Sequence, residues 1–301
     1  MIPLEKFLWP AQEQLFRYLH KMYQSRAICR RAKFLLVQGE APVLLIAHLD
    51  TVHKEPVRVI CKKQKGNLLS SPQGVGGDDR CGVYALVNIH ERAVQKPWLL
   101  FTCDEEIGGI GAEAFAAAYR RKQLPKKLDE MKMLIEIDRK GSCDAVYYGC
   151  ANEDFERYIT GKGFQTEFGS FSDISVIAPA MGVAAVNLSA GYYHAHSVSE
   201  YINRSHIDAV IERVGEMVAD AMRKDIPRFE YVEPDMGQYG WGCFSMWEGY
   251  GTLHAKLPRD LPENYVEVYD LLLDYFTKGE LEAYRKTYGD KVLLELYASV
   301  F

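Results

Sequence analysis

The stretch that most constrains the fold of this chain is VLLIAHLDTVH at residues 43–53. Five apolar residues run directly into a polar group that begins with His48. Such a run is typical of a buried strand that delivers side chains to the edge of a sheet. His48 and Asp50 lie two positions apart, so their side chains point the same way on an extended chain. That spacing suits a metal-binding imidazole steadied by a carboxylate, and a purely structural His–Asp pair explains it equally well.

Further apolar runs with strand character lie at residues 34–37, 97–103, 133–137 and 184–188. Shorter strand-like pieces lie at 57–61, 67–70 and 145–148, and helical patterns at 4–25, 83–94, 112–121, 153–160 and 202–223. Strands that alternate with helices predict an α/β fold. We expect a three-layer α/β/α sandwich whose sheet is mixed and parallel at its centre.

Composition narrows the class of protein. The chain has 301 residues, of which 48% are hydrophobic, and a formal net charge of -5. Slight acidity argues against nucleic acid as the main partner, and the apolar runs are too short to span a membrane. The seven cysteines are scattered and form no CxxC pair. Together with an N-terminus that lacks a secretory pattern, they predict a cytoplasmic protein with reduced thiols.

A glycine-rich segment, GVGGDDRCG at residues 74–82, leads into a helical pattern. Aspartate at a helix start is commonly an N-cap, because its carboxylate accepts backbone N–H groups. The alternative is that the glycines let the chain bend so that one carboxylate points into a site. The segment lacks the GK[ST] of a phosphate-binding loop.

Three carboxylates, Asp104, Glu105 and Glu106, follow the apolar run PWLLFTC. Burying them without a counter-charge would be costly, and a divalent cation would supply that charge. One carboxylate could then bind the metal while its neighbour handles protons. An exposed acidic loop is the alternative, but the glycines that follow allow close backbone approach and favour a site.

Two more segments complete the pattern: Asp138 ends the run at 133–137, and a loop with His194 and His196 follows the run at 184–188. Sites in open α/β sheets gather at the carboxyl ends of strands. We therefore expect five residues to meet there: His48, Asp78, Glu106, Asp138 and His196. Two imidazoles and three carboxylates suit two divalent ions, zinc first, with cobalt or manganese as substitutes.

The ordered set HLDTV, GGDDRCG, DEEIGGIG, IDR and HSVSEY resembles the di-zinc exopeptidase superfamily of aminopeptidases and related carboxypeptidases. The resemblance spans residues 43–200. It implies that His48 and Asp138 bind one metal ion and that Glu106 and His196 bind the other. The carboxylate of Asp78 would bridge the two ions. The short intervals between the motifs leave no room for an inserted lid or β domain, so the chain resembles the compact branch of the superfamily.

The resemblance also implies supporting roles. Glu105 matches the general base, and Asp50 matches the carboxylate that orients the first histidine. We prefer His196 to His194 as a ligand because the superfamily's last ligand is typically followed four residues later by an acid, as here. His194 then becomes a candidate substrate contact or oxyanion stabiliser, and Asp173, in the segment SFSD, a candidate pocket residue.

The resemblance does not explain the end of the chain. Residues 239–251 are rich in aromatic residues and glycine, helical patterns follow at 262–277 and 279–288, and the last ten residues are apolar. We expect a catalytic domain at 1–225 and a helical C-terminal extension at 226–301 that packs on it. An oligomer contact and a cover over the pocket are the alternatives.

These patterns together predict a metal-dependent exopeptidase, an aminopeptidase that hydrolyses small peptides with two divalent ions. An N-acyl amino acid deacylase or a carboxypeptidase with the same metal core is the first alternative. A binding protein that has kept the fold and lost activity is the second. The expected partner is a small peptide or an N-acyl amino acid, and the sequence leaves a homo-oligomer open.

Overall fold

The computed structural model describes residues 2–53, 56–169 and 171–234, together with seven isolated positions: Leu272, Phe276, Leu281, Arg285, Val292, Leu293 and Leu296. The chain divides into two compact units, Met1–Glu233 and Pro234–Phe301. In the second unit the isolated apolar side chains form a buried cluster. The aromatic stretch and the limits of the helices expected after residue 234 lie outside the described residues. The domain limits and the packing of the extension stay predictions.

Eight strands form a large sheet in the order β1-β2-β6-β3-β7-β10-β8-β9. Its central strands, from β6 to β10, run parallel, whereas β1 with β2, β2 with β6 and β8 with β10 pair antiparallel. The predicted mixed, centrally parallel sheet is confirmed. The strands are β1 (Ala27–Arg30), β2 (Phe34–Val37), β3 (Ala41–His48), β6 (Pro97–Thr102), β7 (Met133–Arg139), β8 (Asp144–Val146), β9 (Gln165–Thr166) and β10 (Ala185–Ser189).

A small antiparallel sheet has the order β11-β12-β5-β4. Its strands are β4 (Cys61–Lys63), β5 (Leu68–Ser70), β11 (Tyr192–Tyr193) and β12 (Tyr201–Asn203). The hairpin of β4 and β5 turns through a short 3-10 helix, η1 (Gln64–Gly66). The strand expected at 57–61 begins only at Cys61. Within the expected stretch, the backbone N–H of Arg58 donates to the side-chain oxygen of Gln73 at 3.3 Å and not to a neighbouring strand.

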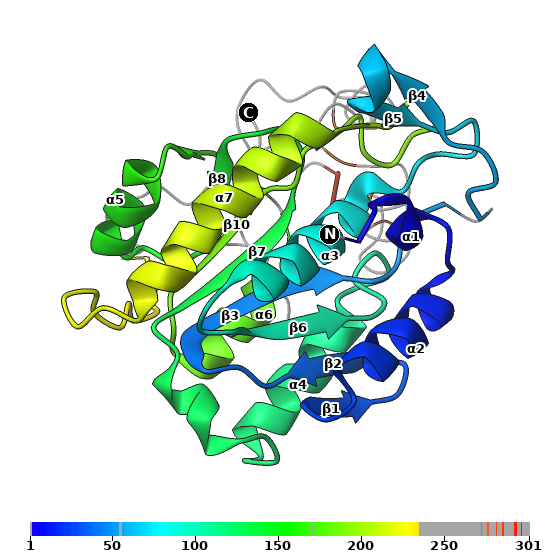
Figure 1. Ribbon diagram of the computed structural model, residues 1–301. Helices are drawn as coiled ribbons and strands as arrows, with labels where there is room; N and C mark the ends of the chain where they lie inside the picture. The colour runs from blue at the N-terminus through cyan, green and yellow to red at the C-terminus, as the bar shows by residue number, and fades with distance from the viewer. Residues whose placement is uncertain are drawn as a thin grey trace. The chain divides into compact units, whose positions relative to one another are not determined.

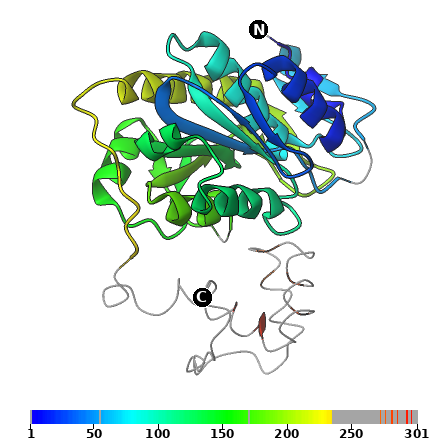
Figure 2. The same cartoon turned by 90° about the horizontal axis from the view of Figure 1, so that it is seen from below.

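Helices cover both faces of the large sheet, which confirms the three-layer sandwich (Figure 1). On one face lie α1 (Glu5–Leu8), α2 (Gln12–Tyr23), α3 (Gly77–Arg92), α5 (Glu153–Gly161) and α7 (Arg204–Ala221). On the other lie α4 (Ile110–Arg120) and α6 (Ile174–Met181), and a 3-10 turn, η2 (Lys126–Glu130), precedes β7. Figure 2 shows the same elements turned by 90°, with the yellow helix α7 on one side of the sheet.

Local sequence explains most of these elements. Strand β3 alternates its apolar side chains between the two hydrophobic clusters, as a strand buried on both faces must. Helix α7 buries residues spaced three or four apart, from Ile207 to Val218, and Asn203 caps it by accepting the N–H of Ser205 at 3.1 Å. The helix expected at 4–25 is split at Pro10 into α1 and α2. Among the described helices none is long and apolar enough to cross a membrane.

Candidate metal centre

The five predicted ligands come together at the carboxyl ends of the central strands. His48 ends β3, Asp138 lies near the end of β7, and Glu106 follows β6. Asp78 lies in the first turn of α3, and His196 lies in the loop between β11 and β12. Parallel strands end at the same edge of a sheet, so side chains far apart in the chain meet there.

The distances divide the ligands into two sets that share Asp78. In the first set, His48 Nε2 lies 3.1 Å from Asp78 Oδ1 and 3.4 Å from Asp138 Oδ1. In the second, His196 Nε2 lies 3.1 Å from Asp78 Oδ2 and 3.2 Å from Glu106 Oε2. The two carboxylate oxygens of Asp78 thus face different imidazoles, which is the arrangement a bridging ligand requires.

The donor set fits divalent ions. Within each set the ligand atoms lie within 4.8 Å of one another. Atoms that bind one tetrahedral ion at about 2.0–2.2 Å lie about 3.3–3.6 Å apart, close to the separations seen here. Glu106 Oε1 is buried and has no hydrogen-bond partner among the described residues. A carboxylate oxygen left in this way is an available ligand atom, because burial without a partner is costly.

The carboxylates of the cluster repel one another, and added positive charge would stabilise their ionised forms. Burial, reinforced by Asp78, raises the pKa of Asp138 to about 7 and raises the pKa of Glu106. Burial alone would lower the pKa of His196, but Asp78 and Glu106 outweigh it and raise that pKa to about 11. The acids outnumber the imidazoles, so two divalent cations would relieve their repulsion.

Asp50 supports both the first imidazole and the acidic loop. Its Oδ1 lies 3.2 Å from His48 Nδ1 and accepts the backbone N–H of Glu105 at 3.1 Å. Its Oδ2 accepts the backbone N–H of Glu106 at 3.0 Å. A carboxylate on Nδ1 leaves Nε2 free as the ligand nitrogen. One side chain therefore sets the tautomer of His48 and the position of the loop that carries Glu106.

Glu105 lies at the edge of the first ligand set, with Oε2 4.0 Å from His48 Nε2. Burial raises its pKa well above the ordinary value, opposed by His48 and reinforced by Asp138. A carboxylate whose pKa is shifted towards neutrality is suited to accepting and returning a proton. The neighbouring Asp104 belongs to neither ligand set. Its carboxylate accepts the side-chain N–H of Gln12 at 2.7 Å, and its backbone N–H donates to the side-chain oxygen of Gln12 at 3.1 Å.

The three polar residues of the DDR motif serve three purposes. Asp78 faces the two imidazoles, whereas Asp79 is fully buried and accepts the backbone N–H groups of His48 and Gly82 at 3.3 and 2.9 Å. Arg80 donates to the carbonyls of Phe7 and Pro10 at 2.9 and 2.8 Å. The motif therefore joins the metal ligand, the end of β3 and the N-terminal helices.

Gly82 is required for the approach of α3 to β7. A Cβ at this position would lie 2.0 Å from the carbonyl oxygen of Ile137. Real side chains essentially never show such a contact, so the backbones can meet here only without a Cβ. This packing holds the helix that carries Asp78 directly beside the end of the strand that carries Asp138.

Neither of the two candidate substrate contacts belongs to a ligand set. His194 is exposed, and its ring packs on Tyr201 with centroids 5.6 Å apart. Asp173 is fully buried just before α6 and accepts the hydroxyl of Thr102. Burial raises the pKa of Asp173 to about 6. Their roles in substrate binding stay predictions.

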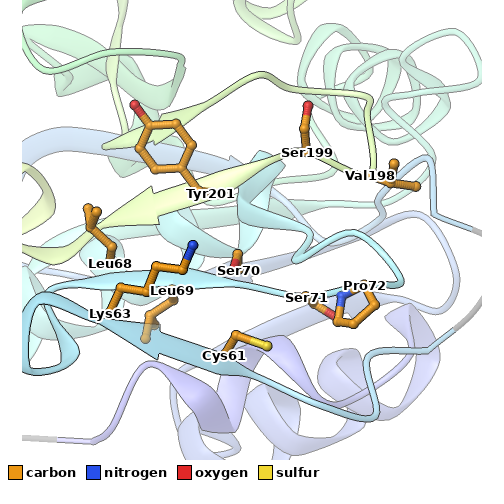
Figure 3. A pocket seen from close by; sticks show the side chains of 10 residues that line it. All are labelled: Cys61, Lys63, Leu68, Leu69, Ser70, Ser71, Pro72, Val198, Ser199 and Tyr201. Carbon is orange, nitrogen blue, oxygen red and sulfur yellow. The ribbon is translucent and has the colours of Figure 1, made fainter.

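A cavity of about 460 Å³ lies beside the small sheet (Figure 3). Strands β4, β5 and β12 line it together with Val198 and Ser199, from the loop that follows His196. Leu68, Leu69 and Pro72 supply apolar wall. None of the five predicted ligands lines this cavity.

No family model and no curated protein matches the sequence. Solved structures do match. An aminopeptidase PepT from Bacillus cereus superimposes with a TM-score of 0.55 at 13% identity, covering 73% of this chain and 97% of that one. The chain shares the fold of these peptidases.

Two further structures support the same fold. A tripeptidase from Staphylococcus aureus has a TM-score of 0.54 at 13% identity and covers 72% of this chain and 96% of its own. The TET1 peptidase from Pyrococcus horikoshii has a TM-score of 0.52 at 14% identity and covers 71% of this chain and 98% of its own. That peptidase can assemble into a tetrahedron or a large octahedral shell.

Proposed function

We propose that this protein is a zinc-dependent aminopeptidase that removes residues from the free amino end of small peptides. The observation that carries the proposal is the position of Asp78, whose two oxygens each lie 3.1 Å from a different imidazole. The fold shared with known peptidases supports it. Two sites made of oxygen and nitrogen ligands suit zinc better than a soft metal ion. Cobalt or manganese would be substitutes.

Each residue has a role in this proposal. His48 and Asp138 would hold one ion, Glu106 and His196 the other, and Asp78 both. Bound ions would polarise the scissile carbonyl and make water a better nucleophile near neutral pH. Glu105 would take the proton from the attacking water on a carboxylate oxygen and deliver it to the leaving amine. Its raised pKa supports that exchange, because a base and an acid must alternate on one group.

The decisive experiment combines metal analysis with paired substrates. The purified protein should contain close to two zinc ions per chain, lose hydrolysis when a chelator removes them, and recover it on reloading. It should hydrolyse a dipeptide with a free amino group and leave the N-acetylated dipeptide intact. Preference for the acetylated substrate would favour a deacylase or carboxypeptidase, and absence of hydrolysis with metal bound would favour a binding protein.

The matched variant is Glu105→Gln, which keeps the size and removes the base. It should bind both ions with wild-type affinity and lose turnover by about 100-fold or more, the scale of general-base contributions. Full activity in this variant would contradict the assignment of Glu105. Cytoplasmic location and self-assembly are predictions that fractionation of the source cells and light scattering would check.

A further inference from the structure

Glu200 is a fully buried carboxylate with three partners, all on segments that form the metal centre. Its Oε1 accepts the backbone N–H of Asp78 at 3.0 Å, and its Oε2 accepts the backbone N–H of Gly76 at 2.8 Å. The same Oε2 lies 2.9 Å from Nε2 of His53, whose side chain is itself largely buried. Every one of these contacts joins positions more than 120 residues apart in the chain.

These contacts connect the two segments that meet at the second ligand set. Glu200 lies in the loop that also carries His196, and it accepts the backbone N–H of Asp78. The carboxylate of the same Asp78 lies 3.1 Å from His196 Nε2. The packing is tight: a Cβ on Gly77 would lie 2.6 Å from Cβ of Tyr192 and 3.1 Å from Oε1 of Glu200. The backbone that precedes and carries Asp78 therefore rests directly on the carboxylate.

We propose that Glu200 is a positioning residue that sets the orientation of the bridging carboxylate of Asp78, with His53 completing its hydrogen bonds. The inference rests on the proposed function, because it concerns the geometry of the same metal centre. Glu200 touches no ligand atom. It acts through the main chain, by holding the N–H of Asp78 in the one position from which both carboxylate oxygens reach the imidazoles.

The two backbone N–H groups that Glu200 accepts belong to buried residues. Without the carboxylate, the N–H groups of Gly76 and Asp78 would be buried without an acceptor, and such groups move to find one. Glycines at 74, 76 and 77 have no side chains of their own, so these hydrogen bonds hold the main chain of the segment directly. A shift of Asp78 would then misplace a ligand common to both ions, and residues that orient ligands typically change metal affinity 10- to 100-fold when removed.

The test compares Co²⁺ binding by chelator-stripped full-length protein and its variants, measured by calorimetry and by the visible absorption of bound cobalt. Glu200→Ala should bind Co²⁺ about 10- to 100-fold more weakly than wild type and show an altered cobalt spectrum. Glu200→Gln keeps one acceptor oxygen and should recover part of both. His53→Ala leaves both N–H acceptors in place and should have a smaller effect than Glu200→Ala.

Asn152→Ala is the matched control. Asn152 also accepts one backbone N–H, that of Phe155 at 2.9 Å, and donates to the carbonyl of Glu230 at 2.8 Å, away from the metal centre. This variant should lower the thermal midpoint while keeping the cobalt affinity and spectrum of wild type. Loss of stability by itself would therefore not imitate the expected result.

The outcomes separate the two proposals. Folded Glu200→Ala with wild-type cobalt affinity and spectrum would overturn the positioning role alone. If that variant does not fold, Glu200→Gln decides by the same criteria, with wild-type values overturning the role. Wild-type protein that binds cobalt and hydrolyses no peptide would overturn the proposed function while the affinity comparison still decides the role of Glu200. Wild-type protein that binds no cobalt would overturn both.

Discussion

Replacement of Asp50 by asparagine is the sharpest test of how the centre is supported. The carboxylate of Asp50 serves three donors at once, His48 Nδ1 and the backbone N–H groups of Glu105 and Glu106. An asparagine has one oxygen. If that oxygen keeps the position of Oδ1, the new NH₂ group faces the N–H of Glu106. If the amide flips, the NH₂ group faces both His48 and the N–H of Glu105.

Either orientation of the new amide loses at least one hydrogen bond to a charged acceptor, about 1.5–3 kcal/mol. At about 1.4 kcal/mol per factor of ten, metal affinity or kcat/KM should fall by about 10- to 100-fold. Competition with a chelating dye measures the zinc affinity, and dipeptide hydrolysis measures kcat/KM. The flipped amide would also demand an unprotonated Nδ1 on His48, which places the proton on the ligand nitrogen and adds to the loss.

Asp104→Asn is the matched control for this prediction. It makes the same chemical change next to Glu105, but its remaining oxygen can still accept the N–H of Gln12. This variant should keep wild-type zinc affinity and turnover. An Asp50→Asn variant that binds zinc and hydrolyses the peptide like wild type would contradict this role of Asp50. So would an Asp104→Asn variant that loses as much as Asp50→Asn.

Two further predictions concern stability. In the metal-free protein the pKa values of Asp173, about 6, and Asp138, about 7, exceed their unfolded value near 4. The stability that these two carboxyls contribute is therefore fully present below pH 4 and is lost as the pH rises through 6–7. Asp173→Asn should recover up to roughly 3 kcal/mol at pH 8 in urea unfolding, and an unchanged pH slope would refute this. Arg80→Met should lower the unfolding free energy by about 1–3 kcal/mol because it unpairs the carbonyls of Phe7 and Pro10. Arg80→Lys should lose less unfolding free energy than Arg80→Met. An Arg80→Met variant as stable as wild type in thermal denaturation would contradict the stabilising role of these two hydrogen bonds.

Much of the fold could be predicted because its signals are local. Apolar runs of strand length and helical spacing depend on neighbours a few residues away, and they indicated the central strands and α3 and α7 correctly. Elements without a prediction lie where the local pattern is weak: β1, β9 and β11 are short strands, and α6 is a brief apolar helix. The short strand β12 takes up the start of the helix expected at 202–223. The break at Pro10 divided what periodicity suggested was one helix.

The candidate site also combines residues that local sequence signals indicate with residues that such signals do not indicate. His48, Glu106, Asp138 and His196 could be proposed from residue type and from their place after apolar runs, because parallel strands present their carboxyl ends together. Asp78 was proposed from the glycine-rich start of a helical pattern, and the resemblance separated His196 from His194. The local pattern alone did not indicate which acid of Asp104, Glu105 and Glu106 lies outside the site, and only the resemblance assigned roles to Glu105 and Glu106. That choice depends on Gln12, which lies 92 positions earlier and donates to Asp104. No local pattern marks such a partner.

The sequence by itself therefore determined the layers, the strand ends and the chemical types of the ligands, since these follow from periodicity and the chemistry of side chains. Only the tertiary structure decided which hydrogen bonds support the site. Asp50 accepts two backbone N–H groups of the acidic loop, and Glu200 accepts the backbone N–H of Asp78. Arg80 donates to a carbonyl of the N-terminal helices. Such contacts pair groups that are remote in the chain and become neighbours only once the core has packed.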